Sequence, residues 1–297
     1  METVLEIKNL TKRYGRITAV NELSLEVKRG EVFGILGPNG SGKTTTLGII
    51  LDVINSNGGG YQWFGQPGSK ETRKRVGAVL ESPIFYPYLT AVKNLEIVAR
   101  IKEVPLDNID KVLKQVGLYE RRDYNFKTYS LGMKQRLSIA SALLCDPEVM
   151  ILDEPTNGLD PMGIAQIRDL IKDIAKSGKT IILASHLLDE VQKVCTHFAV
   201  LNRGKKLYQG LVEDVGKGAQ EVEVRAEHDG LEDVLKAYPK ASSVKFDSGS
   251  HIVTMKEGGN SAELNAYLFE KGITASHLFT QKRTLEKQFL EILAESK

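Results

Sequence analysis

Cysteine is scarce in this chain of 297 residues. The two that occur, Cys145 and Cys195, form no CxxC pair and no Cys/His cluster with metal-ligand spacing, so we expect two buried thiols in a reducing compartment. An excess of charge of one sign is also absent, because 40 Lys and Arg residues are balanced by 38 Asp and Glu residues. A net charge of +2 lacks the basic excess of a phosphate-backbone binder, so nucleic acid is not an expected partner.

Long apolar runs are absent as well. The longest, such as Val149–Leu152 and Ile181–Ala184, fall far short of the ~18 residues that a membrane-spanning helix requires. Residues 1–6 lack the basic and apolar regions of a signal peptide, so we expect no secretion. If the protein serves a membrane, it does so from outside the bilayer.

The first third of the chain predicts strands followed by a loop. Residues 1–30 predict two short strands, Val4–Ile7 and Leu23–Val27, joined by a turn at Tyr14-Gly15 and forming an antiparallel edge. The run Val32–Leu36 is continuously apolar, as in a strand that is buried on both faces. A glycine-rich loop follows it directly.

The middle of the chain alternates helices with strands. Apolar spacings of three and four from Thr90 to about Ser141 predict helices, and strands return at Glu148–Leu152, Thr180–Ala184 and Phe198–Asn202. Parallel strands separated by helices indicate an α/β nucleotide-binding core, with a helical subdomain inserted at about residues 88–145.

A second domain is predicted over residues 219–297. The expected order is strand 221–225, helix 231–238, strands 243–246 and 252–255, helix 262–271 and strand 273–279, a βαββαβ pattern typical of a small α+β ferredoxin-like fold. A closing helix, Arg283–Glu295, carries one apolar stripe and is interpreted as packing on its own domain rather than on a partner.

The glycine-rich loop fits the pattern G-x-x-x-x-G-K-[ST] between a buried strand and a helix. Its glycines let backbone N–H groups surround phosphates at the positive end of that helix. Lys43 is expected to reach the β- and γ-phosphates, and the Thr44 hydroxyl to bind Mg²⁺. The predicted nucleotide site comprises Gly37, Pro38, Asn39, Gly40, Ser41, Gly42, Lys43, Thr44 and Thr45.

Polar side chains follow two later strands. Asp153 and Glu154 end the strand at 148–152, which places Asp153 on the metal and Glu154 beside the attacking water as general base. A rigid strand end positions a base better than a loop. His186 follows the strand at 180–184, so we expect it near the same strand ends, able to hydrogen-bond a γ-phosphate.

Two further segments make the combination specific. Residues 129–137 read YSLGMKQRL, and residues 153–161 read DEPTNGLDP. With the P-loop, and in the same order, they resemble the ATP-binding subunit of ABC transporters over residues 3 to about 215. The resemblance implies a P-loop NTPase with a RecA-like core in an ABC domain of residues 1–215, which binds ATP and Mg²⁺ and hydrolyses ATP to drive transport.

The resemblance also implies residue roles and partners. Tyr14 would stack on the adenine, the alternative being a tyrosine packed in a turn. Ser130 and Gly132 would begin a helix facing the γ-phosphate of a nucleotide held by a second subunit, and Asp160 would cross the same interface. The implied assembly is a homodimer bound to a polytopic permease, cytoplasmic and peripheral on the inner face of the membrane.

Two positions depart from the residues usual in the family. Glu81 stands where Gln is usual, and Leu131 where Gly is usual. A carboxylate at position 81 can still bind Mg²⁺ or orient water, so Glu81 is a candidate catalytic and metal residue. Both departures resemble ABC-2-type exporters for bacitracin resistance and lantibiotic self-protection, which indicates export.

The aromatic segment Pro83–Leu89 follows Glu81. In the family this region borders a groove that receives a coupling helix of the membrane subunit, and packing between the core and the helical subdomain is the alternative.

Two other functions are disfavoured by simple counts. A ribosome factor of this superfamily usually carries two cassettes, and a DNA-repair ATPase needs a long heptad insertion, whereas one P-loop and no such insertion occur here.

Overall fold

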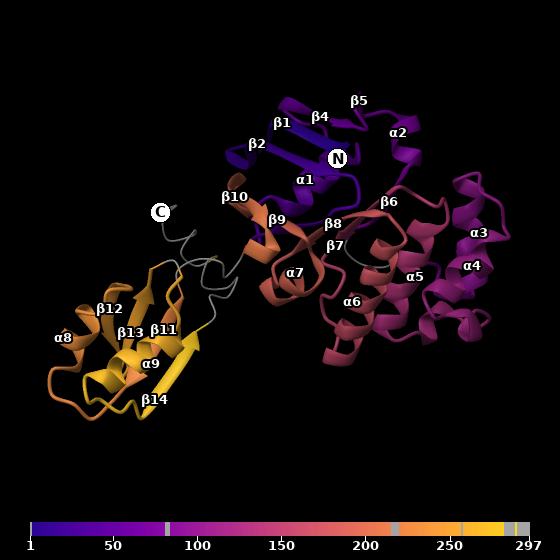
Figure 1. The fold of residues 1–297 in the computed structure, drawn as a ribbon. Coiled ribbons are helices and arrows are strands. Elements are labelled where there is room, and N and C mark those ends of the chain that lie inside the picture. The colour runs from indigo at the N-terminus through magenta and orange to yellow at the C-terminus, as the bar shows by residue number, and fades with distance from the viewer. Residues whose placement is uncertain (1, 81–83, 215–219, 257, 282–288, 290–297) are drawn as a thin grey trace. The chain divides into compact units, whose positions relative to one another are not determined.

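The chain folds as two compact units that divide between Gly210 and Leu211 (Figure 1). The structure is a computed structural model that describes residues 2–80, 84–214, 220–256, 258–281 and 289. Within these ranges no helix is both long enough and apolar enough to cross a bilayer.

An antiparallel sheet opens the first unit. Strands β1 (Thr3–Tyr14) and β2 (Ile17–Lys28) pair with each other, and the sheet order is β2-β1-β4-β5, with β4 at Gly58–Trp63 and β5 at Gln66–Pro67. The turn at Tyr14 is confirmed, but the prediction of two short strands is wrong in length. The register shifts several times between Ile7 and Arg13, which breaks the alternation of apolar and polar residues on which that prediction depended.

A second sheet forms the centre of the unit, in the order β10-β9-β3-β8-β7-β6. Every residue of β3 (Val32–Leu36), β7 (Val149–Asp153) and β8 (Thr180–Ser185) is buried, which explains their continuous apolar sequences. They run parallel to one another and to β6 (Val76–Val79) and β9 (His197–Asn202). The remaining elements of this region are β10 (Lys205–Leu211), α1 (Lys43–Ile50), α2 (Lys70–Lys74), α6 (Pro161–Lys176) and α7 (Leu188–Val194).

The core of the unit joins the two sheets, and α1 lies between them (Figure 1). Trp63 of β4 is fully buried there, and its indole N–H donates to the carbonyl of Ile50 at 2.8 Å. Burial of large apolar side chains from both sheets fixes α1, and therefore the loop before it, in place.

Glu148, just before β7, links three segments at the amino ends of the parallel strands. Its carboxylate accepts hydrogen bonds from Arg29 Nη1 at 2.7 Å and from Arg75 Nε. Arg29 follows β2 and Arg75 precedes β6, and the Arg75 guanidinium stacks on Phe64 after β4. These two guanidinium groups hold the pKa of Glu148 at about 2.

The helical subdomain contains α3 (Ala91–Ile101), α4 (Asn108–Gln115) and α5 (Leu131–Leu143), with 3₁₀ turns at Tyr119–Arg121 and Phe126–Thr128. Helix α5 packs closely on β6, where a Cβ on Gly77 would lie 2.5 Å from the carbonyl oxygen of Ala142. The helices predicted from residue 90 to 141 are confirmed, and α5, which begins within the segment 129–137, packs on the central sheet at its C-terminal end.

The second unit runs β11 (Glu221–Arg225), α8 (Leu231–Lys236), β12 (Ala241–Asp247), β13 (Ser250–Met255), α9 (Ser261–Glu270) and β14 (His277–Gln281), after a 3₁₀ turn at Val212–Asp214. Its sheet has the order β12-β13-β11-β14, and neighbouring strands are antiparallel. An apolar core of its own lies between the sheet and the helices.

The last strand of this unit begins later than the prediction of Ile273–Phe279. Gly272 has a φ of 76°, and the N–H of Ile273 donates to the carbonyl of Leu268, so Ile273 belongs to the C-terminal cap of α9. Its burial reflects that capping contact rather than a strand. The closing helix predicted over 283–295 lies outside the described residues, apart from Phe289.

Candidate functional site

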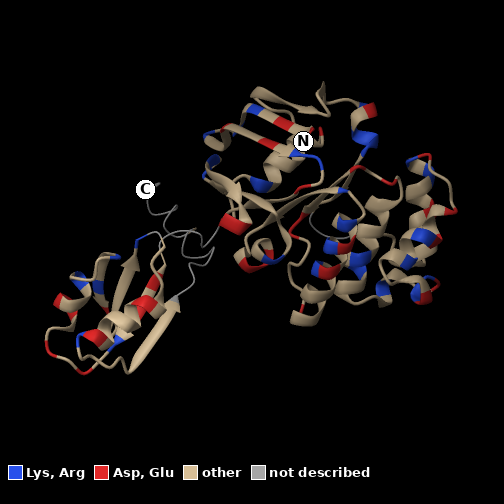
Figure 2. Cartoon of the chain, in the orientation of Figure 1, with Lys and Arg blue, Asp and Glu red and all other residues tan. Residues whose placement is uncertain are grey.

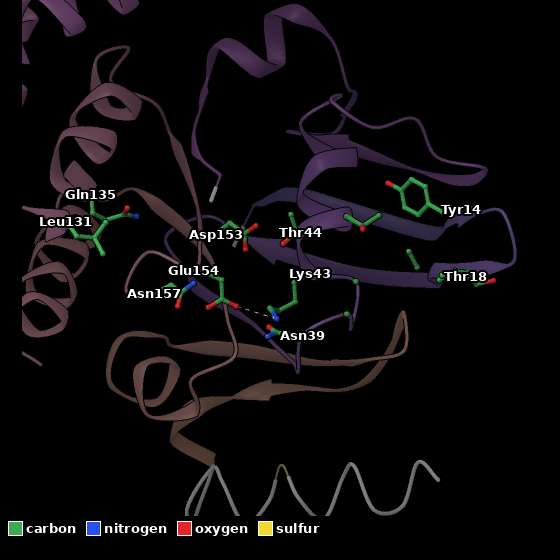
Figure 3. Close-up of a pocket in the computed structure, with 15 residues that line it drawn as sticks. Tyr14, Thr18, Asn39, Lys43, Thr44, Leu131, Gln135, Asp153, Glu154 and Asn157 are labelled. Atoms are coloured by element: carbon green, nitrogen blue, oxygen red, sulfur yellow. Dashed lines mark ion pairs between the residues drawn. The ribbon is translucent and has the colours of Figure 1, made fainter. Parts of the chain in front are cut away.

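A cavity of about 590 Å³ lies at the carboxyl ends of β3 and β7 (Figure 3). Ligands of open α/β sheets bind at such strand ends. The P-loop, β1 and β2, the end of β7 and helix α5 all contribute to its walls. The lining residues are Tyr14, Ile17, Thr18, Ala19, Asn39, Gly40, Gly42, Lys43, Thr44, Thr45, Leu131, Gln135, Asp153, Glu154 and Asn157.

The loop between β3 and α1 is held by backbone contacts that only glycine permits. Gly42 has a φ of 103°, and a Cβ there would lie 2.5 Å from the carbonyl oxygen of Ala19. Lys43 is buried and donates to the carbonyl oxygen of Gly37 at 2.8 Å, so its ammonium group turns back over the loop. The helix N-terminus and the lysine therefore place positive charge at the same point of the cavity.

The acidic residues predicted at the end of β7 lie in this cavity. Asp153 is the fully buried last residue of the strand. Glu154 has a φ of 48°, and its Oε1 lies 3.4 Å from Lys43 Nζ (Figure 3). Its Oε2 lies 2.8 Å from Nδ1 of His186, which follows β8. The structure thus brings Lys43, Glu154 and His186 together, as expected from their positions after neighbouring strands.

Tyr14 lies at the opposite wall from α5, at the end of β1 (Figure 3). Its ring is 47% exposed and is approached by Lys12 Nζ at 4.9 Å from the centroid. Ile17 and Thr18 of β2 lie beside it on the cavity wall. A half-exposed ring next to an aliphatic side chain is suited to stacking on a flat base.

Ser130, Gly132 and Asp160 do not line this cavity, but instead border a separate cavity of about 360 Å³ on the same unit. Ser130 caps the N-terminus of α5 by accepting from the N–H of Met133. Asp160 caps α6 in the same way, with Oδ1 2.8 Å from the N–H of Gly163. One chain therefore presents the phosphate loop in one cavity and Ser130, Gly132 and Asp160 in another, and Leu131 lines both.

Several lining residues were missed by sequence reasoning. Ile17, Thr18 and Ala19 were not predicted, and Gln135 and Asn157 lie in the two motifs but were given no role. The first three belong to β2, which only the antiparallel sheet brings to the P-loop. Among the predicted site residues, Glu81 lies outside the described part of the chain.

The segment after residue 83 presents exposed apolar side chains, and hydrogen bonds hold its backbone from Tyr86 onward. Ile84 is 91% exposed and Tyr88 75% exposed. Buried Asn94 accepts from the N–H of Tyr86 at 2.8 Å and donates to the carbonyl groups of Tyr86, Leu89 and Thr90. Exposed Tyr88 and Ile84 do not follow the alternative of packing between the core and the helical subdomain, whereas half-buried Phe85 packs on Phe126 of the helical subdomain, with ring centroids 5.2 Å apart.

Comparison with known proteins agrees with this geometry. The family model described as ABC transporter matches residues 20–157. The bacitracin transport ATP-binding protein BcrA of Bacillus licheniformis is 36% identical over 99% of this chain and 98% of its own length. This chain belongs to the ABC transporter ATP-binding family. As an ABC ATPase, it binds and hydrolyses ATP as a subunit of a transporter complex.

Other relatives of this ABC ATPase extend the comparison. YhcH of Bacillus subtilis, an ABC transporter ATP-binding protein, is 47% identical over 69% of each chain. The structure of cbiO1 from Clostridium perfringens, part of the complex cbiONQ, has a TM-score of 0.66 and 30% identity, over 72% of this chain and 91% of that one. The dimeric cassette MJ0796, bound to ADP and Pi, has a TM-score of 0.62 and 26% identity, over 70% of this chain and 98% of that one.

Proposed function

We propose that two copies of this chain close around two ATP molecules and drive a membrane permease. The observation that carries the proposal is the separation of Lys43 and Glu154 from Ser130 and Gly132, which border different cavities of one chain. A second copy would supply Ser130, Gly132 and Asp160 to the nucleotide held by Lys43. The similarity to a dimeric cassette supports this arrangement.

In the proposed mechanism, Lys43 and the backbone N–H groups of the P-loop bind the phosphates, and Tyr14 stacks on the adenine. Glu154 takes a proton from the attacking water. His186 orients the Glu154 carboxylate through its Nδ1 contact of 2.8 Å.

The residues of the cavity fit a magnesium ion. The described chain contains no cluster of three or more His, Cys, Asp or Glu residues that could hold a metal alone. Magnesium commonly takes one or two carboxylates and otherwise binds substrate phosphates and water. Thr44 and Asp153 line the same cavity and would hold the ion, with Glu81 as a further candidate. When bound, it neutralises charge on the phosphates.

The catalytic assignment is tested with Glu154→Gln. This variant should bind ATP with unchanged affinity but lose at least 99% of the turnover, and it should accumulate as a nucleotide-bound dimer in size-exclusion chromatography. Asp173→Asn, on the exposed face of α6, is the matched control and should hydrolyse ATP normally. Undiminished hydrolysis by Glu154→Gln would contradict the role of Glu154 as general base. If Glu154→Gln stays monomeric at saturating ATP, the site shared between two copies would be contradicted.

We further propose that the permease docks on the segment Ile84–Leu89 and that the complex exports its cargo, with this chain on the cytoplasmic face of the membrane. Exposed aromatic and aliphatic side chains beside a hydrogen-bonded turn are suited to a helix-in-groove contact. Relatives of this chain include a bacitracin and a lantibiotic transport ATP-binding protein, so peptide antibiotics are the first cargo to test.

Co-expression with a candidate polytopic membrane protein from the same genome tests the docking surface. Ile84→Asp should abolish co-purification of that protein, whereas Tyr124→Ala, an exposed aromatic elsewhere on the helical subdomain, should not. Equal recovery with both variants would contradict the docking site. Deleting the gene for this chain together with the gene for the membrane protein should make cells more sensitive to bacitracin or to a lantibiotic, which would support export. Unchanged sensitivity to both bacitracin and lantibiotics would contradict this cargo.

For the second unit we propose a ferredoxin-like accessory domain over residues 219–297. The support is its βαββαβ order together with the strand order β12-β13-β11-β14. Nucleic acid is not a proposed partner, because acidic and basic residues are interspersed along both units (Figure 2).

A further inference from the structure

Helix α5 presents an unusual polar group to the nucleotide cavity. Gln135 is 5% exposed, and its side-chain nitrogen has no hydrogen-bond partner among the residues that the structure describes. The side chain lines the cavity, and its amide extends from α5 toward the interior (Figure 3). A buried amide without a partner destabilises a fold, so its presence at a cavity wall indicates that it gains a partner during function.

The turn after β7 offers a matching acceptor. Asn157 lines the same cavity, is exposed, and makes no side-chain hydrogen bond within the described chain. Both carboxylate oxygens of Glu154 are already engaged, one by Lys43 and the other by His186. Asn157 Oδ1 is thus an acceptor on this turn to which no side chain of the described chain donates.

Contact between α5 and the turn already exists one residue further along. Leu131 lies one helical turn before Gln135 on the same face of α5. Its Cδ2 lies 3.3 Å from the position that a Cβ on Gly158 would occupy. The leucine thus packs on the backbone next to Asn157, so the face of α5 that carries Leu131 and Gln135 is turned toward this loop.

We propose that Gln135 donates a hydrogen bond from Nε2 to Oδ1 of Asn157, and that this amide latch holds the turn after Glu154 during ATP hydrolysis. Gln135 acts through Asn157, whose backbone N–H donates to the carbonyl of Glu154 at 3.1 Å. Gln135 is therefore a positioning residue for the general base. The proposal rests on hydrolysis at Glu154 and does not depend on the shared dimer site or on the permease.

The first test is Gln135→Leu, which keeps the volume and removes the amide. If Gln135 positions the base, kcat should fall at least ten-fold while the KM for ATP changes by less than about two-fold, and the melting temperature should stay equal or rise by about 2–4 °C. A purely structural glutamine predicts a lower melting temperature and an unchanged kcat, which would overturn the proposal. Ser138→Ala, another buried polar residue on α5, is the matched control and should keep wild-type kcat.

A double-mutant cycle tests the partner. Gln135→Ala and Asn157→Ala should each lower kcat at least ten-fold, and the double variant should be no slower than either single one, because each removes the same bond. Multiplying effects would refute the latch. A rise in the KM for ATP of ten-fold or more would also overturn it, since Gln135 would then contact the nucleotide itself.

Failure of the latch and failure of the proposed function are distinguishable. If Glu154→Gln still hydrolyses ATP, the catalytic assignment is lost whatever the latch variants show. If Glu154→Gln is inactive and Gln135→Leu is fully active, only the latch is lost.

Discussion

Replacing Glu148 with Gln should weaken the first unit measurably. Glu148 accepts from Arg29 and Arg75, which belong to segments far apart in the sequence. The pKa of its carboxyl falls from 4.5 to about 2, which corresponds to about 3.4 kcal/mol at 1.36 kcal/mol per pKa unit. Because the side chain is 35% exposed, solvent screening reduces this value, and we expect a loss of about 1–2 kcal/mol at pH 7.

The contribution of Glu148 to stability should depend on pH, in a direction set by its lowered pKa. A carboxyl whose pKa is lowered by folding stabilises the native state above its unfolded pKa, near 4.5, and this contribution is lost as the pH falls through the folded pKa, at about 2. The difference between wild type and Glu148→Gln should therefore be constant from pH 7 to pH 5 and smaller at pH 3.

Urea unfolding followed by circular dichroism at pH 7, 5 and 3 measures this difference. The matched control is Asp173→Asn, which removes an exposed ion pair to Lys176 and should cost less than about 0.5 kcal/mol at each pH. An equal loss in both variants, or a loss in Glu148→Gln that does not shrink at pH 3, would refute the assignment of this stability to the Glu148 charge.

Three further outcomes follow from single contacts. Gly42→Ala should lower ATP affinity at least ten-fold in fluorescent-nucleotide titration, because its Cβ would lie 2.5 Å from the carbonyl oxygen of Ala19, and normal binding would contradict this geometry. Trp63→Phe should lower the free energy of unfolding in urea by about 2–3 kcal/mol, because the carbonyl of Ile50 loses its indole donor and a void remains. Cys195 should resist thiol reagents at pH 8 until urea unfolds the protein, since burial raises the pKa of its thiol above the usual range, and labelling of native protein at this residue would contradict that burial.

Local features were readable from the sequence alone. The strands Val32–Leu36 and Thr180–Ala184 are recognisable as apolar runs, because a parallel strand in the middle of a sheet is buried on both faces. The P-loop pattern and the carboxylates at the end of β7 were predicted because their chemistry depends on short spacings that a sequence displays directly.

Strand β4 was not predicted, for a physical reason. It begins with Gly58-Gly59-Gly60, a sequence that disfavours strands by itself. A Cβ on Gly59 would lie 2.1 Å from the carbonyl oxygen of Asn9, so the glycine is required by the close approach of β1. This requirement exists only once the sheet has formed.

The sequence by itself determined the family motifs, the phosphate loop and the acidic strand end at Asp153 and Glu154. Only the tertiary structure decided that Ile17 and Thr18 line the nucleotide cavity, that Ser130 lies in a different one, and that Gln135 is buried without a partner. The reason is that motifs depend on neighbours along the chain, whereas cavity walls depend on packing between segments far apart in sequence, which local patterns do not encode.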